Sequence, residues 1–226
     1  MGASLKHNNV LTTLLLHGNG MGPEAGHAFA QALLLNTSLA MMDLQENEVG
    51  MEAAAALAVA FKKHPRLTTL TSLIGPQQTE LKMHIAPDDC VLLAAELATN
   101  SSVQTLTLSM PPSAAGAAIA VVEALHMNTT VRSLGFTGGC VDAKAGKAIG
   151  SALRVNKTLT DVRLRHNNLG AEGVKEITDA LLSNHTLTSL DLAFNRVPRS
   201  ADDACDRDAI KRYRADKKAV PLTLQL

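Results

Sequence analysis

The sequence predicts an α/β fold built from repeated strand-and-helix units that stack on one another. One apolar pattern returns along the chain with a spacing of 28 residues. Each copy begins with strand-like alternation and continues with helical spacing. Only 2% of the 226 residues are aromatic, so thin layers of aliphatic side chains must fill the core. Because such short units cannot bury their apolar faces alone, stacking is expected to form a parallel sheet with helices behind it.

The strand half of the repeat is clearest in LTDVRLRHNNLG, which begins at Leu159. Apolar residues occupy positions one, four, six and eleven, and asparagine occupies position nine. Positions four and six lie on one face of a strand because side chains alternate. The units begin 28 residues apart, except for one gap of 36, at Leu11, Leu39, Leu67, Val103, Val131, Leu159 and Leu187. The sequence therefore predicts seven repeats over 11–197.

The second half of each unit has the spacing of a helix. In GAEGVKEITDALLSN, Val174, Ile177 and Leu181 fall on one helical face. We expect each helix to end at an asparagine, because asparagine tolerates the left-handed backbone that ends many helices. These residues share one phase of the repeat, with His64 as the one substitute: Asn8, Asn36, Asn100, Asn128, Asn156 and Asn184.

Three segments depart from the regular pattern. Residues 1–10 are expected to be the end of an incomplete repeat or an N-terminal cap. The additional residues lie within 75–84, and the alternation of Leu81, Met83 and Ile85 predicts a short additional strand there. Residues 198–226 are expected to form a capping helix and a capping strand, the strand containing Leu222 and Leu224.

The pattern LxxLxLxxNxL followed by a helix resembles the leucine-rich-repeat family. The length near 28 is similar to the ribonuclease-inhibitor subtype, which also occurs in the Ran GTPase-activating protein, NOD-like receptors and tropomodulin. This resemblance implies a leucine-rich-repeat solenoid, a right-handed β/α superhelix with a parallel concave sheet and convex helices. It also implies that the asparagine at position nine bonds backbone groups of the turn. Asn19, Asn47, Asn167 and Asn195 keep this residue, and Gly75, Pro111 and Gly139 replace it.

Composition argues against several classes of partner. The 21 basic and 21 acidic residues cancel, so no strong overall field favours nucleic acid or an anionic membrane. There is no apolar signal core at the N-terminus and no apolar run of the ~18 to 20 residues that a membrane helix needs. Cys90, Cys140 and Cys205 show no metal-ligand spacing and are expected to be reduced thiols. We therefore expect a cytoplasmic protein, possibly associated with the cytoskeleton.

Other short motifs have simpler structural interpretations. Five N-x-[ST] triplets share the helix-ending phase, which favours a structural role over glycosylation. The glycine-rich segment 17–22 does not have the spacing of a nucleotide-binding loop, and Asp88 and Asp89 suit the first turn of a helix better than a metal site with His84. Nothing singles out a nucleophile and a base. We expect no enzyme, no cofactor and no metal, and a small-molecule ligand is not favoured.

The strand residues that alternate with the buried leucines should lie on the open face of the sheet. Polar residues concentrate there near the front and near the back of the array, and arginine is a frequent interface anchor. The candidate partner-binding residues are Asp43, Gln45, Glu46, Asp161, Arg163, Arg165, His166, Asp191 and Phe194. An alternative is a solvated sheet whose aspartates and arginines merely neutralise each other.

The function expected from these features is that of a non-catalytic protein-interaction scaffold that binds a protein partner on the concave face. The family resemblance leaves two alternatives, a regulator of a small GTPase similar to the Ran GTPase-activating protein and an actin-cytoskeleton protein similar to tropomodulin. The first is weakened because this chain ends in a mixed, slightly basic segment and not in a strongly acidic tail.

Overall fold

The computed structural model describes residues 2–71, 73–75, 77–196 and 223–225. The chain divides into two compact units, and each is described by itself. Unit 1 comprises residues 1–76 and 86–99, and unit 2 comprises residues 77–85 and 100–226.

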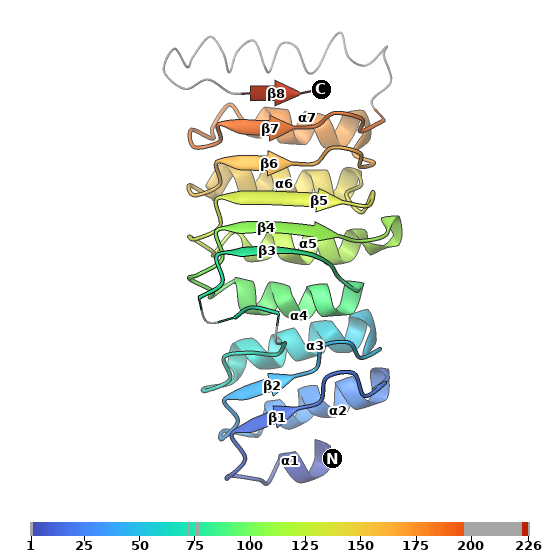
Figure 1. Ribbon diagram of the computed structural model, residues 1–226, viewed down its shortest axis with the longest axis vertical. Helices are drawn as coiled ribbons and strands as arrows, with labels where there is room; N and C mark the ends of the chain where they lie inside the picture. The colour runs from blue at the N-terminus through green and yellow to red at the C-terminus, as the bar shows by residue number, and fades with distance from the viewer. Residues whose placement is uncertain (1, 72, 76, 197–222, 226) are drawn as a thin grey trace. The chain divides into compact units, whose positions relative to one another are not determined.

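Unit 1 contains two paired strands and the helices that follow them. Its elements are α1 (Gly2–Leu5), β1 (Thr13–Leu15), α2 (Pro23–Leu33), β2 (Met41–Asp43), α3 (Gly50–Lys63) and α4 (Pro87–Leu97). β1 and β2 are parallel, with Leu14 opposite Met42. Helices α2, α3 and α4 pack against one another in chain order, and α2 lies behind the two strands (Figure 1).

Unit 2 contains a parallel sheet in which the strands follow chain order, β3-β4-β5-β6-β7-β8. Helices alternate with the strands, and Figure 1 shows α5, α6 and α7 together behind the sheet. The elements are β3 (Glu80–His84), β4 (Thr105–Ser109), the short 3-10 helix η1 (Pro112–Ala114), α5 (Ala115–Ala124), β5 (Ser133–Thr137), α6 (Ala143–Val155), β6 (Asp161–Arg163), α7 (Gly170–Ala180), β7 (Ser189–Asp191) and β8 (Thr223–Gln225).

The apolar positions of the repeat form the core of both units. At position six, Leu44, Leu108, Leu164 and Leu192 are all buried, and strand register places Leu134, Val162 and Leu190 beside one another at position four. The predicted α/β class, with parallel strands and intervening helices, is confirmed. The first repeat differs, because Leu11 is 36% exposed and Leu14 and Leu16 are only half-buried. Within the described residues β1 pairs with β2 alone.

The asparagines that follow the helices have a role different from the predicted one. They follow the helices as expected, but Asn156 has an extended backbone, with φ −68° and ψ 131°, and not a left-handed one. Its side chain bonds the backbone of two coils. The amide Nδ2 donates to the backbone oxygens of Leu125 and Asn128, and Oδ1 accepts from the N–H groups of Thr158 and Leu159. Asn36, Asn128, Asn156 and Asn184 therefore each join two successive coils.

His64 takes over half of this role in unit 1. Its Nδ1 accepts hydrogen bonds from the N–H groups of Arg66 and Leu67, as the asparagine Oδ1 does elsewhere. Its Nε2 is buried and has no hydrogen-bond partner among the described residues. Burial lowers the pKa of His64, so the imidazole favours its neutral form.

The asparagines at position nine have the role that the family resemblance implies. Asn167 Nδ2 donates to the backbone oxygens of Phe136 and Leu164, and Asn195 Nδ2 donates to those of Leu164 and Leu192. Asn47 makes the same pair of contacts in unit 1, with Leu16 and Leu44. Asn19 donates only to the oxygen of His17 within its own turn.

The region of the additional residues differs from the simple repeat. The strand expected around Leu81 and Met83 is present as β3, and it pairs in parallel with β4. By contrast, the strand expected at Leu67 and Leu70 is reduced to one bridge, between Met41 and Thr69. The physical reason is that the backbone N–H groups of Leu70 and Thr71 are bonded to a side chain, the carboxylate of Glu96 in α4.

The predictions for the C-terminal segment fall mostly outside the described residues. Strand β8 pairs in parallel with β7, with Leu224 opposite Leu190. The capping helix expected within 198–226, together with Val197, Cys205 and Leu222, lies outside the part of the chain that the structure describes.

Candidate functional site

The back group of predicted site residues lies on β6, β7 and the turns that follow these strands. In β6 the exposed Arg163 alternates with the buried Val162 and Leu164, so Arg163 lies on the face of the sheet away from the helices. Arg165 and His166 follow in the turn, and both are exposed. Asp191 ends β7 and the exposed Phe194 lies in the next turn. The structure therefore brings together residues from two consecutive coils.

The charged residues of this group form ion pairs along the sheet. Arg163 Nη2 lies 2.7 Å from Asp161 Oδ2, which also accepts a hydrogen bond from the hydroxyl of Ser133. Arg165 Nη1 lies 3.9 Å from Asp191 Oδ2. These contacts match the alternative in which aspartates and arginines neutralise each other. Ion pairs this exposed contribute little stability and remain open to exchange with a partner.

Phe194 forms an exposed aromatic platform with its neighbours. Phe194 is 62% exposed. Its ring stacks on His166, with ring centroids 4.6 Å apart and an angle of 9° between the planes. The guanidinium carbon of Arg165 lies 4.6 Å from the centroid of the same ring. Stacking on two neighbours restricts the phenyl group while leaving much of it open to solvent.

The turns that carry these residues have an unusual backbone. Position eight of the repeat is left-handed in several coils, with glycine in two of them, Gly18 at φ 66° and Gly138 at φ 89°. At the same position His166 has φ 59° and Phe194 has φ 61°. A left-handed conformation is unfavourable for a bulky side chain. The chain therefore places an imidazole and a phenyl ring where its own repeat elsewhere uses glycine.

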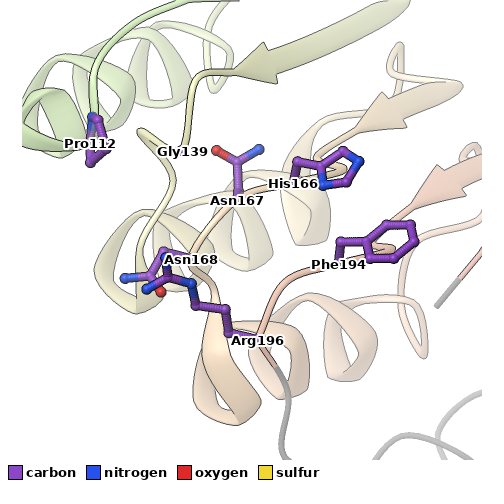
Figure 2. A pocket seen from close by; sticks show the side chains of 7 residues that line it. All are labelled: Pro112, Gly139, His166, Asn167, Asn168, Phe194 and Arg196. Atoms are coloured by element: carbon purple, nitrogen blue, oxygen red, sulfur yellow. The ribbon is translucent and has the colours of Figure 1, made fainter.

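A pocket of about 240 Å³ opens beside the platform. Figure 2 shows it between the turns that follow β5, β6 and β7, with His166 and Phe194 at one side and Arg196 and Asn168 at another. Pro112, Gly139 and Asn167 complete the lining. Arg196 and Asn168 were not predicted, because each lies two residues further into its turn than Phe194 and His166 and so further from the strand alternation. The glycines at equivalent positions of other repeats were the one available signal that these turns have a special backbone.

Two segments of unit 2 match a known family in sequence. The model for the leucine-rich repeat matches residues 155–177 and 183–197, which include β6, most of α7 and β7. These segments are leucine-rich repeats. A solved structure of leiomodin-1 actin-binding site 2 is similar, with a TM-score of 0.48 and 24% identity over 62% of this chain and 83% of that chain. No curated protein matches the chain in sequence.

The platform and the pocket therefore lie on the turns of these leucine-rich repeats and of the coil before them. The ribonuclease-inhibitor subtype remains a prediction. The described residues contain no cluster of three or more His, Cys, Asp or Glu side chains arranged to hold a metal ion. No helix among them is long and apolar enough to cross a membrane.

The front group of predicted residues lies in unit 1 and is less open than expected. Asp43 was predicted on the exposed face, but the residue is only 5% exposed. Its Oδ1 accepts a hydrogen bond from the N–H of Gln45, so it stabilises the turn after β2. Glu46 is exposed, and its Oε2 lies 3.3 Å from His17 Nε2. Gln45 is partly exposed between them.

Buried carboxylates on α4 contact the same turn. As predicted, Asp88 and Asp89 lie in the first turn of a helix. Asp88 Oδ2 accepts from the N–H of Gly50, and Asp89 Oδ2 accepts from the N–H of Glu46. The pKa of Asp89 is raised to about 6, mainly by burial and also by the nearby charges of Asp88, Glu46 and Asp43, although the hydrogen bond from the N–H of Glu46 lowers it.

Glu96 is the third buried acid of α4, and it was not predicted from the sequence. Its Oε1 accepts hydrogen bonds from the N–H groups of Leu70 and Thr71 and from the hydroxyl of Thr71. Burial raises the pKa of Glu96 to about 7 in spite of these bonds. Because these contacts satisfy backbone groups of unit 1, Glu96 has a structural role.

Proposed function

We propose that this protein is a non-catalytic interaction module and that a protein partner binds the exposed face and turns of β6 and β7. The observation that carries the proposal is the Phe194 platform. An exposed ring fixed by stacking presents apolar area with little loss of side-chain entropy on binding, as interface anchors require. Family membership of the repeats supports a binding role in general, and it does not identify the partner.

The proposed contact surface consists of Arg163, Arg165, His166, Asp191 and Phe194. The two exposed arginines supply forked donors, and each can exchange its partly buried aspartate partner for a carboxylate or carbonyl of the protein that binds. In unit 1, Gln45 and Glu46 are proposed as a second contact area. Asp43 is left out because its carboxylate is buried in the turn.

Alanine substitution of the platform tests this proposal. Proteins captured from lysate by the wild type are identified by mass spectrometry, and the most enriched one is purified for affinity measurement. We expect Phe194→Ala and the double variant Arg163→Ala/Arg165→Ala each to weaken its binding at least about tenfold, equivalent to ~1.4 kcal/mol. The matched control is Met127→Ala, another large apolar residue of unit 2, which is 75% exposed.

The outcomes separate the proposal from its alternatives. Equal loss of binding in the Met127 control and the platform variants contradicts the assigned surface, and so does binding that neither platform variant weakens. Capture of actin or of a small GTPase would assign the partner to one of the two classes suggested by the family resemblance. If the protein accelerates GTP hydrolysis by a captured GTPase, the non-catalytic part of the proposal is wrong.

A further inference from the structure

The pocket beside Phe194 is smaller than most sites that enclose small-molecule ligands. Its volume of about 240 Å³ lies below the roughly 300–1,000 Å³ of sites that enclose small-molecule ligands. The ring of Phe194 and the ring of Pro112 supply apolar walls, and His166, Asn168 and Arg196 supply polar groups (Figure 2). A group with a short apolar stem and a polar tip fits this combination.

The polar groups of the pocket differ in their availability. Asn167 is committed to the fold, because its Nδ2 bonds backbone oxygens and its Oδ1 accepts from the N–H of Val141. The side chains of His166, Asn168 and Arg196 make no hydrogen bond or ion pair to any described residue. These three side chains therefore have donors available for a ligand.

The charge of the available groups favours an anion. No Asp or Glu lines the pocket. The nearby Arg163 and Arg165 are each paired with an aspartate, which leaves Arg196 as the uncompensated positive charge at this place, within the described residues. A guanidinium pairs with a planar carboxylate through two parallel N–H donors, and an amide such as Asn168 can add a third.

Three of the residues that line the pocket share an unusual backbone conformation. His166, Phe194 and Arg196 all line the pocket, and all three have positive φ, at 59°, 61° and 59°. At the position equivalent to Arg196, the first repeat has Gly20, with φ 62°. Glu46, at position eight of the second repeat and outside the pocket, has φ 55°, so the left-handed backbone belongs to the turn of the repeat.

We infer that this pocket binds a carboxylate side chain, Glu or Asp, of the protein partner, with Arg196 and Asn168 as its donors and the ring of Phe194 beside its methylene groups. This inference rests on the proposed function, because the partner that supplies the carboxylate is the one that contacts the platform. It assigns an acidic segment of the partner to the turns of unit 2.

Peptide titration tests the inference directly. The 15N-labelled protein is titrated with the capped peptide acetyl-(Gly-Glu)4-amide, with its glutamine analogue and with inorganic phosphate, while amide chemical shifts are followed. We expect the acidic peptide to shift the signals of His166, Asn168 and Arg196 and the glutamine peptide to leave them in place. Arg196→Met should weaken binding of the acidic peptide at least tenfold. The control Arg132→Met, at an exposed arginine of unit 2, should change the Kd of this peptide less than twofold.

Several results would overturn the inference. These are equal shifts with both peptides, an Arg196→Met variant that binds as the wild type does, or no shift with an acidic peptide that should bind with a Kd below about 10 mM. Shifts produced by phosphate and not by the acidic peptide would assign the pocket to a free anion. Thermal unfolding of Arg196→Met establishes that the variant is folded.

Partner capture by Arg196→Met separates this inference from the proposed function. If Phe194→Ala abolishes capture and Arg196→Met does not, the surface is correct and the carboxylate site is wrong. If the acidic peptide binds the pocket but neither Phe194→Ala nor the arginine double variant affects capture, the carboxylate site stands and the proposed surface is wrong.

Discussion

Single side chains connect the coils of this protein as much as the apolar layers do. Asn36 Nδ2 donates to the backbone oxygens of Leu5 and Asn8, and Asn184 Nδ2 reaches Leu153 and Asn156 in the same way. Each buried amide thus satisfies backbone groups of its own coil and of the coil before it. This explains why N-x-[ST] triplets recur at one phase without requiring glycosylation. The asparagine is fixed by its hydrogen bonds and not by a left-handed backbone.

His64 provides a test of this role. In His64→Asn, the new amide should donate to the backbone oxygens of Leu33 and Asn36, which lie at the distances along the chain that Asn156 bridges. Since the Nε2 of His64 is buried and unsatisfied, we expect the free energy of unfolding to rise by about 1 kcal/mol. Urea denaturation at pH 7 measures the change. The control His64→Ala should lower the free energy of unfolding. If His64→Asn is no more stable than His64→Ala, the linking role of an asparagine at this position is contradicted.

Helix α4 shows how a regular element can compensate for an irregular one. Where the third repeat lacks a full strand, the carboxylate of Glu96 accepts hydrogen bonds from the backbone N–H groups of Leu70 and Thr71. The acids Asp88 and Asp89 hold the turn before α3 in a similar way. Helix α4 thus bonds backbone N–H groups of unit 1 that do not pair with a neighbouring strand. It does so with buried acids, whose charged form is unfavourable away from water.

The raised pKa of Glu96 predicts that the stability of the protein depends on pH. Its pKa is about 7 in the folded protein, above the ordinary value of 4.5. Between these values the folded state holds a proton that the unfolded state has released, so the contribution of Glu96 to stability falls as pH rises from about 4.5 to about 7. The loss is on the order of 1 to 3 kcal/mol.

The variant Glu96→Gln isolates this contribution. The glutamine oxygen can still accept the N–H groups of Leu70 and Thr71, but it does not titrate. We expect the stability of the variant relative to the wild type to rise by the same ~1 to 3 kcal/mol between pH 5 and pH 8. Denaturant unfolding at both pH values measures it. A difference that stays constant across this range would show that Glu96 does not carry a raised pKa.

In the molecule as a whole, burial within the stack depends on neighbours on both sides. Leu164 and Leu16 occupy position six of different repeats. Leu164 is fully buried between β5 and β7, whereas Leu16 is half-buried beside β1, which has a single paired strand among the described residues. Identical positions in the sequence pattern should therefore contribute different amounts of stability.

Leucine-to-alanine substitution measures this difference. We expect Leu164→Ala to lower the free energy of unfolding by ~2 to 5 kcal/mol because it leaves a cavity. Leu16→Ala should cost less than about 1.5 kcal/mol, since much of its side chain is already in water. Amide hydrogen exchange should rise in β5 and β7 of the Leu164 variant, because neighbouring coils share one core. Equal costs for the two variants would argue against the described stacking.

The sequence by itself determined the repeat, its phase and the α/β class. The reason is that a strict spacing of apolar residues specifies which residues each coil buries, such as Leu44 in unit 1 and Leu108 and Leu164 in unit 2. It also identified β3, because the alternation around Leu81 and Met83 is local information. The exposure of Arg163 and Arg165 was predicted for the same reason, since alternation specifies which residues of a strand and its end are exposed.

The tertiary structure decided what depends on neighbouring coils and on backbone angles. The features that it decided include the hydrogen bond from the N–H of Leu70 to Glu96, which the pattern of the repeat does not specify. The burial of Asp43 and the exposure of Leu11 depend on what the neighbouring coils cover. The pocket needs segments from four coils, and Arg196 joins it through a left-handed backbone that its residue type does not indicate. Periodic patterns encode local geometry and burial within a coil, whereas sites assembled between coils exist only once the coils have stacked.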